Sequence, residues 1–356
     1  NGLLAAETIN TGHLDVRVDE LDIGHADANG DAYLKAAEGD LAIRGLRASG
    51  KADLESAATV SFGYPEQDDA PLTPADLDIG TTLNVRAEDD IRGGNAISGD
   101  TMELVAGQEL IFGRLESLGL DLLLEAGTDI TGARAIAARD LGIVAGGRLK
   151  VDDTRYGGSL SLRAGRDLTI GTGEDIVLTG AIEAGRDITV TSGEAINMES
   201  LRAGRDVYLE ADGDINIEKF LSAGADVASE YDIYDTGNLT LLSTGNVTVG
   251  EDVRANGTMD IQVDGNLQVA GEMTALERIN AVTGENLEVA GGIQSRASSV
   301  WLDTGASLVT PELLAGSWLD VTTGGSELAL ERGLANEEVN IRVGTARSEE
   351  RRVGKE

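Results

Sequence analysis

The chain has 356 residues, no cysteine, and a formal net charge of −35 that comes from 63 acidic and 28 basic side chains. Such an acidic surface repels phosphate backbones, which argues against nucleic acid as a partner and disfavours anionic lipid. The sequence contains no run of 18 apolar residues, so we predict no membrane span. The absence of cysteine is compatible with export but does not prove it.

Apolar residues recur early in the chain at steps of 19 or 20. Leu21 returns as Leu41 and then as Val60, and Leu34 returns as Leu54. Within each run the apolar residues sit at i and i+2, which is the period of a β-strand. No window has apolar spacing typical of a helix. The pattern breaks over residues 63–74, which hold three of the four prolines. Because proline cannot donate to a central strand ladder, we predict an inserted loop there.

The register resumes in two predicted columns of inward side chains. The first column is Leu83, Met102, Leu122, Leu141 and Leu160, each with an apolar companion two residues later. The second column is Ile91, Leu110, Ile130, Leu149 and Leu168.

The clearest repeat lies between Leu162 and Ile217, where the tetrad Ala-Gly-Arg-Asp starts at Ala164, Ala184 and Ala203. Two alternating runs follow each tetrad. A thinner third column runs through Leu162, Ile182, Leu201 and Leu221. A repeat this short cannot bury an apolar face alone, but stacked repeats can. We therefore predict an all-β parallel β-helix, a solenoid with about 19–20 residues per coil, rather than a leucine-rich repeat or a β-sandwich.

A second insert is predicted at 228–236, which includes Tyr231 and Tyr234. Three columns then continue: Leu239, Met259, Ile279, Val300, Leu319 and Val339; Val247, Leu267, Leu287, Leu308 and Leu328; Val253, Met273, Ile293, Leu314 and Leu334. Trp301 and Trp318 adjoin inward positions, so we expect both outside the core or at a corner. With 47 glycines and 3% aromatic residues, the composition suits a narrow core of small aliphatic side chains.

We predict one β-helical segment over residues 1–345. The last stretch, 346–356, has no repeat signal and resembles translated vector or adapter sequence, so we expect a non-native or disordered tail. The chain lacks an initial methionine and a signal peptide, which suggests an internal fragment of a longer protein.

The charged residues at the corners are explained more simply by a structural role than by a binding or catalytic role. Stacking would place Asp167, Asp187 and Asp206 about 4.8 Å apart, where each pair repels by roughly 0.9 kcal/mol in water. The neighbouring arginines, Arg166, Arg186 and Arg205, can offset this repulsion. Calcium binding is a further hypothesis for the acidic clusters, although none has EF-hand spacing. These clusters are Glu88-Asp89-Asp90, Asp152-Asp153 and Asp68-Asp69.

Catalytic signals are weak, and we predict no catalytic, cofactor-binding or metal site. His13 and His25 have no nucleophile motif of the G-x-S-x-G type beside them. The Asn-x-Ser/Thr matches at Asn238, Asn246 and Asn256 are most simply turn residues. The 63 acids supply carboxylate pairs by chance, so a polysaccharide lyase or glycoside hydrolase, with acids beside the two inserts, stays open as the alternative.

The units AGRDLTI, AGRDITV and AGRDVYL, with TGNLTLL, TGNVTVG and DGNLQVAG, resemble the repeats of filamentous haemagglutinin-type bacterial exoproteins. This resemblance implies a right-handed β-helical shaft, secretion through an outer-membrane two-partner transporter, and adhesion at the bacterial cell surface to a receptor or glycan of a host or neighbouring cell. It supplies no functional residue. The family's secretion domain is not found in the sequence.

Overall fold

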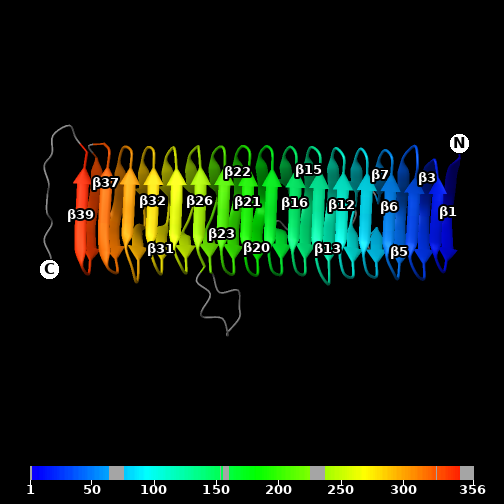
Figure 1. The fold of residues 1–356 in the computed structure, drawn as a ribbon, viewed down its shortest axis with the longest axis horizontal. Coiled ribbons are helices and arrows are strands. Elements are labelled where there is room, and N and C mark those ends of the chain that lie inside the picture. Colours follow the sequence, from blue (N-terminus) through cyan, green and yellow to red (C-terminus); the bar gives the residue numbers. More distant parts are fainter. Residues whose placement is uncertain are drawn as a thin grey trace. The chain divides into compact units, whose positions relative to one another are not determined.

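The computed structural model describes residues 2–63, 76–152, 154, 160–224, 237–325 and 327–344. These residues form β-strands and turns and no α-helix. The chain divides into two compact units, Asn1–Gly180 and Ala181–Glu356. Each unit is a β-solenoid in which parallel strands from successive turns pair side by side (Figure 1). The predicted fold class is therefore confirmed, and the single continuous rod over 1–345 stays a prediction.

In the first unit, one strand of each turn belongs to a sheet that we call sheet B. Its strands are β2 (Leu14–Val18), β4 (Ala32–Ala36), β6 (Ala52–Ser56), β9 (Leu83–Ala87), β12 (Met102–Ala106), β14 (Leu122–Ala126), β16 (Leu141–Ala145) and β19 (Leu168–Thr172). The rest of each turn contributes to sheet A. Its strands are β1 (Leu3–Thr11), β3 (Glu20–Ala28), β5 (Leu41–Ala48), β7 (Val60–Phe62), β8 (Leu77–Ile79), β10 (Ile91–Gly93), β11 (Ala96–Ser98), β13 (Leu110–Ser117), β15 (Ile130–Ala137), β17 (Leu149–Val151), β18 (Leu160–Ala164) and β20 (Ile176–Ala184).

The second unit repeats this arrangement. Its sheet B strands are β21 (Ile188–Ser192), β23 (Val207–Ala211), β26 (Leu239–Ser243), β29 (Met259–Val263), β32 (Ile279–Thr283), β35 (Val300–Thr304), β37 (Trp318–Thr323) and β39 (Glu338–Val343). Its sheet A strands are β22 (Ile196–Ala203), β24 (Ile215–Ile217), β25 (Leu221–Ala223), β27 (Val247–Val249), β28 (Val253–Ala255), β30 (Leu267–Val269), β31 (Glu272–Ala275), β33 (Leu287–Val289), β34 (Gly292–Ser295), β36 (Leu308–Ala315) and β38 (Leu328–Ala335).

The core consists of aliphatic ladders, because strand residues alternate between inside and outside and the pairing is in register. Leu239 pairs with Met259, Met259 with Ile279, and Ile279 with Val300, all fully buried. This predicted column is confirmed, with steps of about 20 residues. The early column through Leu21, Leu41 and Val60 is confirmed in the same way.

The core admits a phenylalanine only where the next turn supplies a glycine. Phe62 pairs with Gly93, and Phe112 pairs with Gly132. Between them, the two residues before Gly93 pair with the two residues before Phe112. A Cβ atom on Gly93 or on Gly132 would lie 2.1 Å from the Cζ of the phenylalanine before it. The rings therefore occupy the space that side chains on the glycines would need. This alternation explains how a narrow core of aliphatics holds two aromatic rings.

Two predicted column members of the first unit are wrong. Leu141 pairs with Leu168, not with Leu160, and Leu149 pairs with Ile176, not with Leu168. Leu162, the companion of Leu160, pairs instead with Ala135 in sheet A. The step across this turn is 27 residues, so the chain has an insertion here that the sequence analysis missed. Leu160 lies 19 residues after Leu141 by coincidence and carries the same alternating pattern.

Two members of the third column, Leu314 and Leu334, are wrong by one residue. Ile293 pairs with Leu313, which is fully buried, and Leu314 points outward. Pro311 and Glu312 are two consecutive residues that face outward, and this shifts the alternation by one. Leu334, aligned with Leu314, is 44% exposed.

Both predicted inserts are visible as long steps in the register. Asp53 and Asn84 are 31 residues apart on adjacent turns, and Asp206 and Asn238 are 32 apart. The inserted residues 64–75 and 225–236, with the predicted tail 346–356, lie outside the described residues.

Candidate functional site

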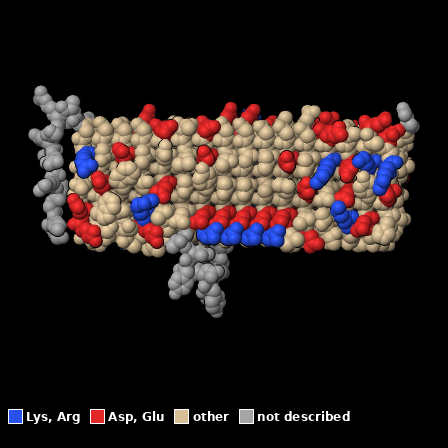
Figure 2. All heavy atoms as spheres, viewed as in Figure 1, with Lys and Arg blue, Asp and Glu red and all other residues tan. Residues whose placement is uncertain are grey.

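Acidic and basic side chains alternate along one corner of the first unit, just before the sheet B strands. Arg139 forms a bidentate pair with Asp121 of the preceding turn, with Nε–Oδ1 at 2.7 Å and Nη2–Oδ2 at 2.5 Å. Arg166 pairs in the same way with Asp140, with Nε–Oδ1 at 2.8 Å. Each arginine also lies beside the aspartate that follows it, as for Arg166 and Asp167 at 3.3 Å. Basic and acidic side chains form adjacent rows on the face shown in Figure 2.

The second unit has the same corner. Arg205 Nε donates to Asp187 Oδ1 at 2.8 Å, and Arg186 lies 3.3 Å from Asp187. At the next turn Asn238 takes the place of the aspartate in the register, and its backbone N–H and side-chain amide donate to Asp206 Oδ1 at 2.9 and 3.2 Å. The predicted self-neutralising corner motif is confirmed for these residues.

The aspartates at this corner also stabilise the backbone. Asp140 N donates to Asp121 Oδ1 at 3.2 Å, and Asp167 N donates to Asp140 Oδ1 at 3.3 Å. At the corner before sheet A, Asn246, Asn266 and Asn286 form a similar ladder. The side-chain amides of Asn266 and Asn286 donate to the Oδ1 of the asparagine one turn earlier, at 2.9 and 2.7 Å. Corner Asp and Asn residues therefore hold successive turns together.

The sequence analysis did not predict this acceptor role, although the signal is present. An Asp or Asn stands directly before the first inward residue of many strands, as in Asp140-Leu141 and Asn266-Leu267. The asparagines at Asn238 and Asn246 lie at such corners, as predicted for turn residues. Much of the acidic surface thus has a structural task.

The arginine contacts change the titration of two corner aspartates. The hydrogen bond from Arg139 is the main cause that lowers the pKa of Asp121 below its ordinary 3.8. Burial acts to raise the pKa of Asp187, but the hydrogen bonds from Arg205 and from Asp206 N outweigh it, and the pKa is lowered. In Asp76 burial dominates and raises the pKa.

We expect the midpoint of thermal unfolding to fall steeply once the pH drops below about 3.8. The stability that Asp121 and Asp187 contribute is fully present above their unfolded pKa of 3.8, and it is lost as the pH falls through their lowered folded pKa values. Calorimetry from pH 7 to pH 2 measures this. The Asp121→Asn, Asp187→Asn double variant should lose less stability over the acid range. If the double variant lost as much stability between pH 7 and pH 2 as the unmodified chain does, the contribution assigned to Asp121 and Asp187 would be contradicted.

Two aspartates of the clusters proposed for calcium, Asp90 and Asp152, bind other partners. Asp90 accepts from Glu109 N at 3.1 Å and pairs with Arg92 at 3.2 Å. Asp152 Oδ1 accepts three hydrogen bonds from Thr154 and Thr179, and the one from the Thr154 hydroxyl is the main cause of its lowered pKa. In the parts of the chain that the structure describes, no three His, Cys, Asp or Glu side chains gather to hold a metal. Asp68, Asp69 and Asp153 lie outside the described residues.

We expect EDTA to leave the melting temperature of the purified chain unchanged. The corner aspartates already find their donors in backbone N–H groups and arginines, so they need no cation to hold them. Differential scanning fluorimetry with EDTA and then with excess Ca²⁺ measures this. A fall in the melting temperature that Ca²⁺ restores and Mg²⁺ does not would establish a calcium site instead.

The two histidines each lie against a glycine of the next turn. A Cβ on Gly30 would be 2.7 Å from His13 Nδ1, and one on Gly45 would be 2.5 Å from His25 Nδ1. His13 Nδ1 also accepts from Asp31 N at 3.3 Å. Both rings therefore lie at outward corner and strand positions of the first unit.

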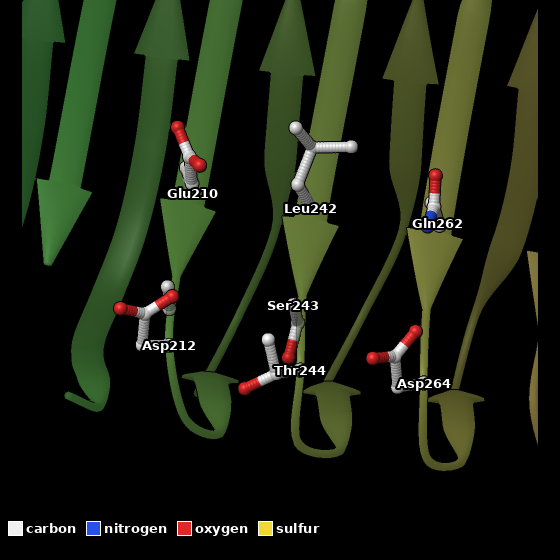
Figure 3. Close-up of a pocket in the computed structure, with 8 residues that line it drawn as sticks. Glu210, Asp212, Leu242, Ser243, Thr244, Gln262 and Asp264 are labelled. Atoms are coloured by element: carbon white, nitrogen blue, oxygen red, sulfur yellow. The ribbon is translucent and has the colours of Figure 1, made fainter. Parts of the chain in front are cut away.

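A small open hollow lies on the second unit. Its volume is about 120 Å³, and its lining comprises Glu210, Ala211, Asp212, Leu242, Ser243, Thr244, Gln262 and Asp264. Glu210, Leu242 and Gln262 come from neighbouring strands, and Asp212, Thr244 and Asp264 come from the turns after them (Figure 3). The sequence analysis did not find this hollow.

The hollow offers little for glycoside chemistry. Its volume is below the roughly 300–1,000 Å³ typical of ligand pockets, and no Lys or Arg is among its lining residues. Glu210 accepts from the Tyr208 hydroxyl at 2.6 Å, and this hydrogen bond is the main cause of the raised pKa of Tyr208. The two inserts predicted to flank a catalytic groove lie outside the described residues.

Among the described residues, no helix is long and apolar enough to cross a membrane.

Comparisons with protein-family models, with curated proteins and with solved structures each found no match to this chain.

Proposed function

We propose that the chain is a non-catalytic, structural and adhesive shaft segment of a large secreted bacterial surface protein. The observation that carries this proposal is the regular stacking, in which inward aliphatics, corner acids and asparagines recur at steps of 19–20 residues. Such a design stabilises a framework and presents a repetitive outer surface.

The proposed setting follows from the likeness of the Ala-Gly-Arg-Asp and Gly-Asn repeats to filamentous haemagglutinin-type exoproteins. The proposed partners are an outer-membrane two-partner transporter and a receptor or glycan on a host or neighbouring cell. The proposed location is the bacterial surface. The ladders of Asp121, Asp140 and Asp187 support a framework role, since their carboxylates bind backbone N–H groups and arginines.

A bead-adhesion assay tests the proposal. Beads coated with the purified chain are incubated with epithelial cells and with Gram-negative bacteria, and beads coated with a globular protein of similar negative charge serve as the control. Saturable attachment that soluble chain competes away is the expected result. Attachment no greater than that of the control beads would contradict an adhesive role.

The alternative, a polysaccharide-active enzyme, rests on the acids around the hollow, Glu210, Asp212 and Asp264. Incubation of the chain with neutral and acidic polysaccharides, followed by assays for new reducing ends and unsaturated uronates, tests it. Cleavage that is lost in the Asp212→Asn variant would replace the shaft proposal. We expect no cleavage.

A further inference from the structure

The chain's only two tryptophans lie on one outer face of the second unit. Trp301 pairs in register with Asp320 of the next turn, and Trp318 precedes Asp320 by two residues on the same strand. Because strand side chains alternate, Trp301, Trp318 and Asp320 all point outward from sheet B. Trp318 is 45% exposed and Trp301 is partly exposed. The expectation that both tryptophans lie outside the core is confirmed.

Two polar side chains flank Trp301 in the same outward row. Asn280 pairs with Trp301 on one side, and Asp320 pairs with it on the other, so the three lie about 4.8 Å apart in successive turns. The Oδ1 atoms of Asn280 and Asp320 are both buried and accept no hydrogen bond from the residues that the structure describes. A buried acceptor without a donor costs about 1–3 kcal/mol. Each oxygen therefore favours a ligand that brings a donor.

The surrounding charges restrict which ligand fits. Two arginines lie on this face: Arg278, which is paired with Asp260 at 2.9 Å, and Arg342, which pairs in register with Thr322. Asp303 and Glu338 lie on neighbouring positions of the same face, and the chain as a whole carries a net charge of −35. Sulfated or uronate-rich glycans would be repelled. A ligand with hydroxyl donors and an apolar C–H face meets both the acceptors and the indole rings.

We propose that Trp301, Trp318, Asn280 and Asp320 form a binding subsite for a neutral oligosaccharide. A pyranose ring stacks on the indoles, and its hydroxyl groups donate to Asn280 Oδ1 and Asp320 Oδ1. Neither oxygen is solvent-accessible in the unliganded chain, so the side chains that cover these two atoms move when the sugar binds. This inference rests on the proposed adhesive function and names the ligand class and the residues for it.

Tryptophan fluorescence tests the subsite directly, because every tryptophan of the chain belongs to it. The intact chain is titrated with neutral oligosaccharides based on glucose, galactose, mannose and N-acetylglucosamine, and with polygalacturonate as the anionic control. We expect a saturable change in emission with at least one neutral series and none with polygalacturonate. No response to any neutral series, or a response to polygalacturonate alone, would overturn the proposal.

Variants separate binding from stability. Calorimetric titration with the responding oligosaccharide should show about ten-fold weaker binding for Trp318→Ala and a smaller loss for Trp318→Phe, with melting temperatures near that of the unmodified chain. Tyr208→Ala, which removes another outward aromatic ring of the second unit, is the matched control and should bind normally. A lower melting temperature with unchanged binding for Trp318→Ala would show that the indole only covers the surface.

The bead assay distinguishes this inference from the function on which it rests. If Trp318→Ala beads attach to cells as well as unmodified beads do, the subsite is wrong and the adhesive shaft stands. If unmodified beads fail to attach while the fluorescence response is present, the subsite stands as a sugar-binding site and the adhesive proposal fails.

Discussion

Replacing Gly132 with valine is expected to lower the free energy of unfolding by about 3 kcal/mol, the upper range for overpacking a core. A Cβ at this position would lie 2.1 Å from Phe112 Cζ and 2.3 and 2.5 Å from its two Cε atoms. Phe112 is 4% exposed and lies in a closed ladder, so its ring has no free space to enter. Urea unfolding followed by circular dichroism measures the loss.

A size swap tests the cause of this loss. The Phe112→Val, Gly132→Val double variant restores an aliphatic ladder, so it should be more stable than Gly132→Val alone, with a coupling energy of about 2 kcal/mol. Gly142→Val is the control, because it adds the same side chain to an outward glycine. A Cβ atom on Gly142 would lie 3.2 Å from Leu123 Cδ1. Equal losses for Gly132→Val and Gly142→Val would contradict the alternation of ring and glycine.

The second large effect is expected at Asp140, where alanine should cost about 2 kcal/mol and asparagine less than about 1 kcal/mol. Alanine leaves Asp167 N–H without its acceptor at the corner and removes the bidentate partner of Arg166. The lost acceptor dominates, because the Arg166 side chain is 47% exposed and such surface ion pairs contribute little. Asparagine keeps the acceptor, as Asn246 and Asn266 do in their own ladder.

Urea unfolding of the two variants at low and high salt measures this difference. High salt should reduce the difference in unfolding free energy between Asp140→Asn and the unmodified chain, because that difference comes from the ion pair. It should leave the difference between Asp140→Ala and Asp140→Asn unchanged. Asp22→Ala is the control, because no hydrogen bond or ion pair of Asp22 is found in the described part of the chain, and it should change stability by less than about 0.5 kcal/mol. Equal losses for Asp140→Ala and Asp140→Asn would show that charge, not the backbone acceptor, holds this corner.

Most of the fold was predictable because each turn repeats the same inward positions. The column from Leu239 to Val339 followed from steps of 19 to 21 residues alone. Leu160 was misplaced because an insertion can leave the spacing and the alternation unchanged while moving a strand to another sheet. Leu314 was misplaced because two adjacent leucines satisfy the same pattern, and the two consecutive outward residues before them make Leu313 the inward one.

The candidate sites were less predictable, since they depend on which outward residues the register brings together. Glu210 and Thr244, which line the hollow, come from β23 and from the turn after β26. These strands pair across a step of 32 residues that contains an insert, so regular spacing does not bring them together. Trp301 and Asp320 are 19 residues apart in the sequence, but their shared row follows only from the pairing of β35 with β37. The corner acceptors could have been found from the recurring Asp or Asn before each strand.

Disulfide trapping tests the central claim most directly, namely that residues one turn apart lie side by side in a parallel solenoid. The chain has no cysteine, so an introduced pair has no competitor. Lys150 and Val177 are outward register partners on β17 and β20, and paired strands lie about 4.8 Å apart, within the range that a disulfide spans. Lys150 and Thr169, by contrast, belong to different sheets.

The account predicts that Lys150→Cys, Val177→Cys forms the disulfide rapidly under mild oxidation, as seen by mass spectrometry of linked peptides, and that Lys150→Cys, Thr169→Cys does not. Linkage of the second pair and not of the first would show that the chain is wound with the 19-residue spacing at this turn and would contradict the register. Failure of both pairs to link would contradict the parallel solenoid itself.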